Sequence, residues 1–132
     1  MTSSPKATTT HNQIILVVED EVLISEILCE ILENEGLAAV AKPDADQALA
    51  YLNAHAHFVA LILTDINMPG SINGAGLANH SRLAWPQIPI IVMSGKETPE
   101  GAGISVETPF LRKPFVMAEM VSAVRASLEV TG

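Results

Sequence analysis

Residues 14–21 read IILVVEDE, so five aliphatic residues run directly into three acids. An unbroken run of this kind is typical of a strand that is covered on both faces of a parallel sheet. Apolar residues then recur at three- and four-residue spacing until Gly36, which predicts an amphipathic helix that ends at this glycine. The chain is therefore expected to begin with a buried strand, an acidic loop and a helix that covers the sheet.

The same alternation of strand and helix continues along the chain. Between residues 95 and 108 there are several glycines and no apolar stripe, which predicts a fourth helix that is short or irregular. The whole pattern indicates an α/β fold, with a doubly wound five-stranded parallel sheet between two layers of helices. Further strands are expected at residues 38–41, 58–64, 88–93 and 110–111, and further helices from Asp44 to about 52, from Asn73 to about 83 and from about 116 to 128.

Composition narrows the class of protein. The 132 residues suffice for one domain, and 7 basic against 15 acidic residues give a net charge of −8, which argues against direct nucleic-acid binding. The apolar runs are far shorter than the roughly 20 residues that a membrane-spanning helix needs. Residues 1–12 are rich in Ser and Thr and lack the apolar core of a signal peptide. We expect a disordered tail over residues 1–12, a folded domain over 13–130, no membrane insertion and a cytoplasmic location.

Polar side chains follow the predicted strands at the points where the strands end. They are Glu19 with Asp20, then Asp65, Ser94 and Lys113. Right-handed crossovers bring the carboxyl ends of parallel strands to one edge of the sheet, where ligands of such folds bind. Three carboxylates at one edge repel each other, and Mg²⁺ is a natural counter-ion because it prefers oxygen ligands. A cation, an ammonium and a hydroxyl can stabilise phosphoryl oxygens, while a carboxylate can act as the nucleophile.

Four motifs in this order carry a resemblance to a known family. They are LVVED at residues 16–20, TDINMP at 64–69 followed by Asn73 and Gly74, MSG at 93–95, and RKPF at 112–115. With them the chain resembles the receiver domains of two-component response regulators, including the stand-alone chemotaxis type, over about residues 14–128. The resemblance implies the flavodoxin-like βα repeat.

The resemblance also implies a role for each acid at the strand ends. Asp65 is the expected phosphoacceptor, which receives a phosphoryl group from the phosphohistidine of a histidine kinase. Mg²⁺ is the expected cofactor, bound by Asp20 and Asp65, by Glu19 through water, and by the backbone carbonyl of Asn67. The domain is then a phosphoacceptor that assists its own phosphorylation and dephosphorylation rather than an enzyme.

Three further positions match the family's phosphoryl-binding and switch residues. By resemblance, Ser94 bonds a phosphoryl oxygen and moves on activation, and Lys113 pairs with the phosphoryl group. Phe110 matches the aromatic position whose ring turns inward when Ser94 shifts. The implied partners are a sensor histidine kinase or phosphotransfer protein, an unidentified downstream protein and a second copy in a homodimer. Because only Thr131 and Gly132 follow the last helix, we expect output by protein contact or phosphorelay.

Other interpretations of the same residues stay open at this stage. Asp20 could be an N-cap of the first helix, and Glu21 a first-turn acid favoured by the helix dipole. An aspartyl-phosphate phosphohydrolase typically needs a second Asp two residues after the nucleophile, where this chain has Asn67. A degenerate receiver that docks its partner without phosphorylation is the remaining alternative.

Overall fold

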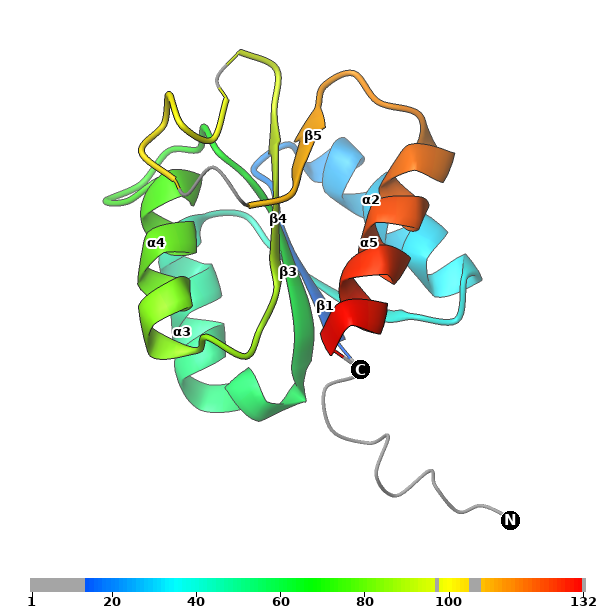
Figure 1. The fold of residues 1–132 in the computed structure, drawn as a ribbon, viewed down its shortest axis with the longest axis horizontal. Helices are drawn as coiled ribbons and strands as arrows, with labels where there is room; N and C mark the ends of the chain where they lie inside the picture. Colours follow the sequence, from blue (N-terminus) through cyan, green and yellow to red (C-terminus); the bar gives the residue numbers. More distant parts are fainter. Residues whose placement is uncertain (1–13, 97, 105–107, 132) are drawn as a thin grey trace.

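The computed structural model describes residues 14–96, 98–104 and 108–131, and the predicted tail lies outside them (Figure 1). The strands are β1 (Ile14–Val18), β2 (Ala38–Lys42), β3 (Val59–Asp65), β4 (Ile90–Ser94) and β5 (Phe110–Arg112). They form the five-stranded parallel sheet that the sequence predicts, and their order in it is β2-β1-β3-β4-β5. The helices are α2 (Val22–Asn34), α3 (Ala45–His55), the 3₁₀ turn η1 (Ala56–Phe58), α4 (Gly74–Ala84) and α5 (Met117–Thr131).

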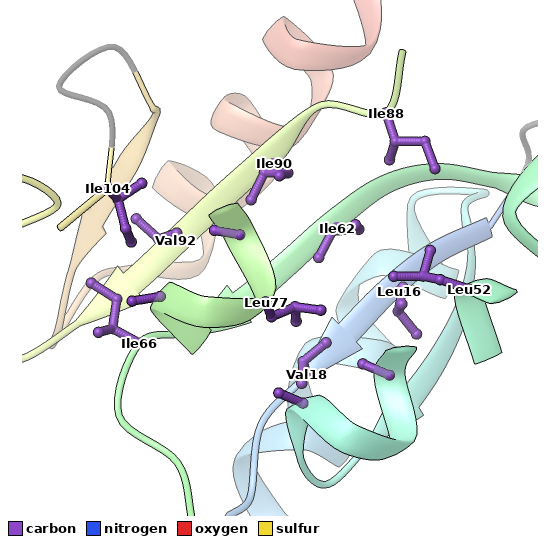
Figure 2. Packing of buried hydrophobic residues seen from close by; sticks show 14 of the residues in the cluster. Leu16, Val18, Leu52, Ile62, Ile66, Leu77, Ile88, Ile90, Val92 and Ile104 are labelled. Carbon is purple, nitrogen blue, oxygen red and sulfur yellow. The ribbon is translucent and has the colours of Figure 1, made fainter. Parts of the chain in front are cut away.

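The sheet separates two apolar cores. Helices α3 and α4 cover one face and helices α2 and α5 cover the other (Figure 1). In the first core cluster, Leu52 of α3 and Leu77 of α4 pack with Leu16 and Ile62 of the central strands (Figure 2). The central strands are buried on both faces, which is why their sequences are continuously aliphatic rather than alternating.

Local signals set most helix ends where the sequence places them. Asp44 caps α3 by accepting a hydrogen bond of 2.8 Å from the Gln47 amide, and Asn73 caps α4 in the same way. Gly36 follows α2 with a φ of 84°, a conformation that side chains other than glycine rarely adopt. Two predicted strand starts were early, by one residue for β3 and by two for β4, while the other three agree with the structure. Phe58 belongs to η1, and β4 begins only at Ile90.

The stretch between β4 and β5 contains no α-helix among its described residues, in agreement with the predicted irregularity. Residues 98–104 form a turn in which the Ile104 amide donates to the Pro99 carbonyl at 2.7 Å. Asn79 of α4 donates to the Gly103 carbonyl at 3.0 Å, which ties this turn to the neighbouring helix. None of the helices in the described part of the chain is long and apolar enough to cross a membrane.

Candidate functional site

The carboxyl ends of the strands carry the candidate site. Asp65 is the last residue of β3 and Ser94 the last of β4, while Glu19 directly follows β1 and Lys113 directly follows β5. Parallel pairing fixes these ends side by side, and the Ile66 amide donates to the Met93 carbonyl at 2.9 Å just beyond the last paired residues. Topology therefore brings residues that are far apart in the sequence to one edge of the sheet.

Three acids form a compact cluster at this edge. Glu19, Asp20 and Asp65 each offer a carboxylate oxygen, and these oxygens lie within 4.8 Å of one another. Glu19 and Asp65 are buried, with 2% and 8% of their surface exposed, whereas Asp20 is exposed. The structure thus assembles the three acids that the sequence singles out.

Lys113 joins two of these acids. Its Nζ lies 3.0 Å from Oε1 of Glu19 and 3.2 Å from Oδ2 of Asp65, and it donates a hydrogen bond to each. The sequence indicates that Lys113 belongs to this edge, but it does not predict that Glu19 is the nearer partner. The sequence indicated this contact only in that it places a lysine after one strand and an acid after another at the same edge of the sheet.

Burial and charge act against each other at the buried acids. Burial raises the pKa of Asp65 above its ordinary 3.8, and the charge of Asp20 adds to this, while Lys113 and the Asn67 backbone N–H oppose it. Burial likewise raises the pKa of Glu19, against its hydrogen bond from Lys113. Burial alone would lower the pKa of Lys113, but Glu19 and Asp65 outweigh it, so this pKa is raised. The ammonium therefore stays charged and only partly compensates the acids.

The start of α2 excludes two interpretations of the acidic loop that the sequence leaves open. Glu21 occupies the N-cap position and makes no side-chain capping bond, so neither Asp20 as the N-cap nor Glu21 as a first-turn acid agrees with the structure. Instead the Glu21 amide donates to Oε2 of Glu19 at 3.2 Å. Glu19 is thus held at both of its oxygens, by a backbone amide and by Lys113.

A pocket of about 460 Å³ opens beside Asp65. Its lining, which we call the acceptor pocket, consists of Asp65, Asn67, Gly95, Lys96 and Lys113. The sequence analysis assigned Asn67 to this edge but missed Lys96. The position of Lys96, two residues beyond the end of β4, could have indicated that it lies at the same edge. The Asn67 backbone N–H bonds to the Asp65 carboxylate and favours its ionised form.

Ser94 directly precedes Gly95 of this pocket, whereas Phe110 lies at the other end of β5 from Lys113. Ser94 is buried, and its Oγ accepts a hydrogen bond of 3.2 Å from the Lys96 amide. Phe110 is half-buried against the first core cluster, and the Arg112 guanidinium lies 5.4 Å from its ring centre. Phe110 therefore serves the core, and the structure leaves its predicted switch role untested.

Gly74 sets the position of α4 against Asp65. Its amide donates to the Ile66 carbonyl at 2.8 Å. A Cβ at this position would lie 1.7 Å from the carbonyl oxygen of Asp65, a distance that no side chain can adopt. Only glycine lets the helix start this close to the end of β3.

The donor set fits a hard divalent cation. Three carboxylates face one ammonium, so the cluster carries an excess of negative charge when all four groups are ionised. Carboxylate and carbonyl oxygens are the ligands that Mg²⁺ prefers. Glu19, Asp20 and Asp65 could hold such an ion, together with the backbone carbonyl of Asn67.

The chain is similar to known proteins in sequence and in fold. A family model described as "Response regulator receiver domain" matches residues 15–125. The chain is 34% identical over 119 residues to the nitrogen assimilation regulatory protein NtrX of Azorhizobium caulinodans, covering 87% of this chain and 26% of that protein. The chain spans from about a quarter to half of the first curated relatives that it matches.

Solved structures give the same result. The receiver domain of NtrX from Brucella abortus is 31% identical with a TM-score of 0.76, and the match covers 87% of this chain and 98% of that chain. A response regulator receiver protein from Sinorhizobium medicae is 27% identical with a TM-score of 0.81, covering 90% of this chain and 96% of that chain.

Proposed function

Because this chain belongs to the response regulator receiver domain family of two-component systems, we propose that Asp65 is its phosphoacceptor and that phosphorylation of Asp65 switches the binding of a partner protein. The observation that carries the proposal is the meeting of three carboxylates and the Lys113 ammonium around Asp65. Members of this family are phosphoacceptors rather than conventional enzymes. The domain then stores a signal as an acyl phosphate and passes it on by contact.

The chemical step is a phosphoryl transfer between two proteins. An oxygen of the Asp65 carboxylate attacks phosphorus, an O–P bond forms, the N–P bond of the donor phosphohistidine breaks, and the departing imidazole takes up a proton. Lys113, 3.2 Å from Oδ2 of Asp65, favours the ionised nucleophile and is placed to pair with phosphoryl oxygens. Mg²⁺, held by Asp20, Asp65 and the Asn67 carbonyl, and by Glu19 through water, would neutralise charge on those oxygens.

The switch would begin at Ser94. Its Oγ now accepts from the Lys96 amide, and a bond from its hydroxyl to a phosphoryl oxygen would move the end of β4. Phe110 pairs with Val92 across the β4–β5 ladder, so a shift of β4 reaches this half-buried ring directly. We propose that the surface around β4, β5 and α5 is read by the downstream partner. A protein partner is favoured over DNA because the chain carries a net charge of −8.

The phosphodonor needs a docking surface beside Asp65. An apolar groove of about 420 Å³, lined by Ile24, Ile27, Leu28, Pro114, Phe115 and Met117, lies between α2 and the start of α5. Lys113 lines both this groove and the acceptor pocket, so the two adjoin at this side chain. We propose that the sensor kinase or phosphotransfer protein packs here while its phosphohistidine reaches Asp65.

Labelling by a small phosphodonor tests the acceptor. With acetyl phosphate and Mg²⁺, we expect Asp65→Asn to lose labelling entirely. Asp44→Asn should keep full labelling, because asparagine also caps the start of α3. Undiminished labelling of Asp65→Asn would contradict the proposal, and multiple turnover of a phosphate monoester would favour a phosphohydrolase. A partner that binds the phosphorylated and unphosphorylated forms equally would favour the constitutive docking module.

A comparison of two donors tests the groove. Ile27→Asp should slow transfer from a phosphorylated histidine phosphotransfer protein by at least about tenfold, because a charge would be buried at the contact. Labelling by acetyl phosphate should not change, since Ile27 does not line the acceptor pocket. Leu83→Asp is the matched control, because Leu83 is 85% exposed on α4 at the other face of the sheet. Equal effects of both variants would refute the docking surface.

A further inference from the structure

A contact between α3 and the loop that follows Asp65 lies outside the acid cluster. Asp46, in the first turn of α3, accepts a hydrogen bond of 3.1 Å at Oδ2 from the backbone amide of Ser71. Its Oδ1 accepts a second, short hydrogen bond from the Ser71 hydroxyl. One exposed carboxylate therefore binds both donors of a single residue that lies 25 positions away in the chain.

The loop concerned connects β3 to α4 and contains Asn67. Its ends are fixed by backbone bonds, from Ile66 to the Met93 carbonyl and from Gly74 to the Ile66 carbonyl. Between these ends Met68 and Ile72 pack against the first core cluster, and Ser71 is bonded to α3. The contact with Asp46 thus holds an exposed part of the loop, between the two residues that pack against the core.

Gly70 shows how closely the loop approaches Asp46. Its φ of +122° is one that other residues rarely adopt, and a Cβ here would lie 3.0 Å from Oδ2 of Asp46. Glycine also brings conformational freedom, three residues from Asn67, and that freedom has to be restrained if Asn67 is to keep its place. Two bonds to a carboxylate on a helix supply that restraint.

We propose that Asp46 is a positioning residue, whose two hydrogen bonds to Ser71 fix the loop over residues 66–73 and so hold Asn67 beside Asp65 for divalent cation binding. The inference rests on the proposed function, because it concerns the preorganisation of the same site. Ser71 lowers the pKa of Asp46 through both of its hydrogen bonds, so the carboxylate remains an acceptor throughout the neutral range.

Magnesium binding without any phosphodonor is the measurement that tests Asp46. Isothermal titration with MgCl₂ should give a dissociation constant about tenfold weaker for Asp46→Ala than for the unmodified protein, which is the lower end of the effect that outer residues orienting metal ligands carry. Ser71→Ala, which removes one bond and keeps the amide donor, should weaken binding about two- to threefold. Asp44→Asn removes a neighbouring charge, keeps the helix cap and should bind normally.

The same variants separate positioning from plain stabilisation. Labelling of Asp46→Ala by acetyl phosphate should need more Mg²⁺ for half-maximal rate while the maximal rate is retained. If Asp46→Ala has a lower melting temperature but an unchanged Mg²⁺ dissociation constant, the inference is overturned. If Asp46→Ala fails to fold, an unchanged Mg²⁺ dissociation constant in Ser71→Ala overturns it instead. Failure of the unmodified protein to bind Mg²⁺, or normal binding by Asp20→Asn, would instead refute the proposed metal site itself.

Discussion

Substitution of Gly74 by alanine tests the link between the fold and the proposed phosphoacceptor, Asp65. The new Cβ would lie 1.7 Å from the carbonyl oxygen of Asp65 and 2.8 Å from the Cα of Ile66, while real Cβ atoms keep at least 3.0 Å. Both obstacles are backbone atoms, so no side-chain rotation can relieve the contact. Either α4 or the end of β3 must move by more than an ångström, and Asp65 lies at the point of contact.

The expected size of the effect follows from that displacement. Overpacking at a rigid site costs about 1–3 kcal/mol of stability. We expect Gly74→Ala to lower the free energy of unfolding by about 3 kcal/mol, measured by urea denaturation. A misplacement of about 1 Å at a reacting group can cost about 100-fold in rate, so labelling by acetyl phosphate should fall by a comparable factor.

A second glycine in the same helix provides the control for Gly74→Ala. A Cβ at Gly76 would lie 3.3 Å from the Cβ of Ile72, a side-chain atom that can yield by a few tenths of an ångström. Gly76→Ala should therefore label normally, and it should gain up to about 1 kcal/mol from helix propensity. Stability and labelling at the unmodified level in Gly74→Ala would refute this account of how Asp65 is positioned.

Three further perturbations act on the charges of the site. Lys113→Met should lower the free energy of unfolding at pH 7 by about 2–4 kcal/mol in urea, because buried Glu19 and Asp65 lose their ammonium partner; an unchanged value would count against it. In EDTA, a raised carboxyl pKa contributes stability that is fully present below the unfolded pKa and is lost as pH rises through the folded pKa. The free energy of unfolding of Asp65→Asn should therefore rise relative to that of the unmodified protein as the pH increases from about 4. A difference between the two proteins that stays constant with pH would contradict this. Mg²⁺ at ten times its dissociation constant should stabilise the unmodified protein and Glu30→Gln by about 1.4 kcal/mol in thermal melts but leave Asp20→Asn unchanged, and equal stabilisation of all three would argue against this cluster as the metal site.

The sequence predicts the parts of the molecule that follow from local pattern and topology. The central strands are continuous aliphatic runs, and the ends of all five strands could be placed within two residues. Parallel topology then brings Asp65 and Lys113 to one edge. Caps at Asp44 and Asn73 were predictable because asparagine and aspartate have a specific role at helix starts.

The parts that the sequence does not predict depend on long-range geometry. Neither the contact of Lys113 with Glu19 nor the contact of Asp46 with Ser71 follows from any local pattern, because each depends on how loops from different strands are placed. The close backbone contact between Gly74 and Asp65 likewise cannot be predicted from the sequence, because it depends on how α4 packs on the sheet. These contacts orient the groups whose convergence the topology alone predicts.

The charge balance at the sheet edge suggests how phosphorylation could reach β5. Three carboxylates and one ammonium leave a net charge of −2 when all are ionised, which a divalent cation would bring to zero. A phosphoryl group on Asp65 would add negative charge again and compete with Glu19 for the Lys113 ammonium. Lys113 directly follows β5, the strand that begins with Phe110, so a change of its partner would act on the same strand as a shift of Ser94. Both effects of phosphorylation would then converge on one half-buried ring.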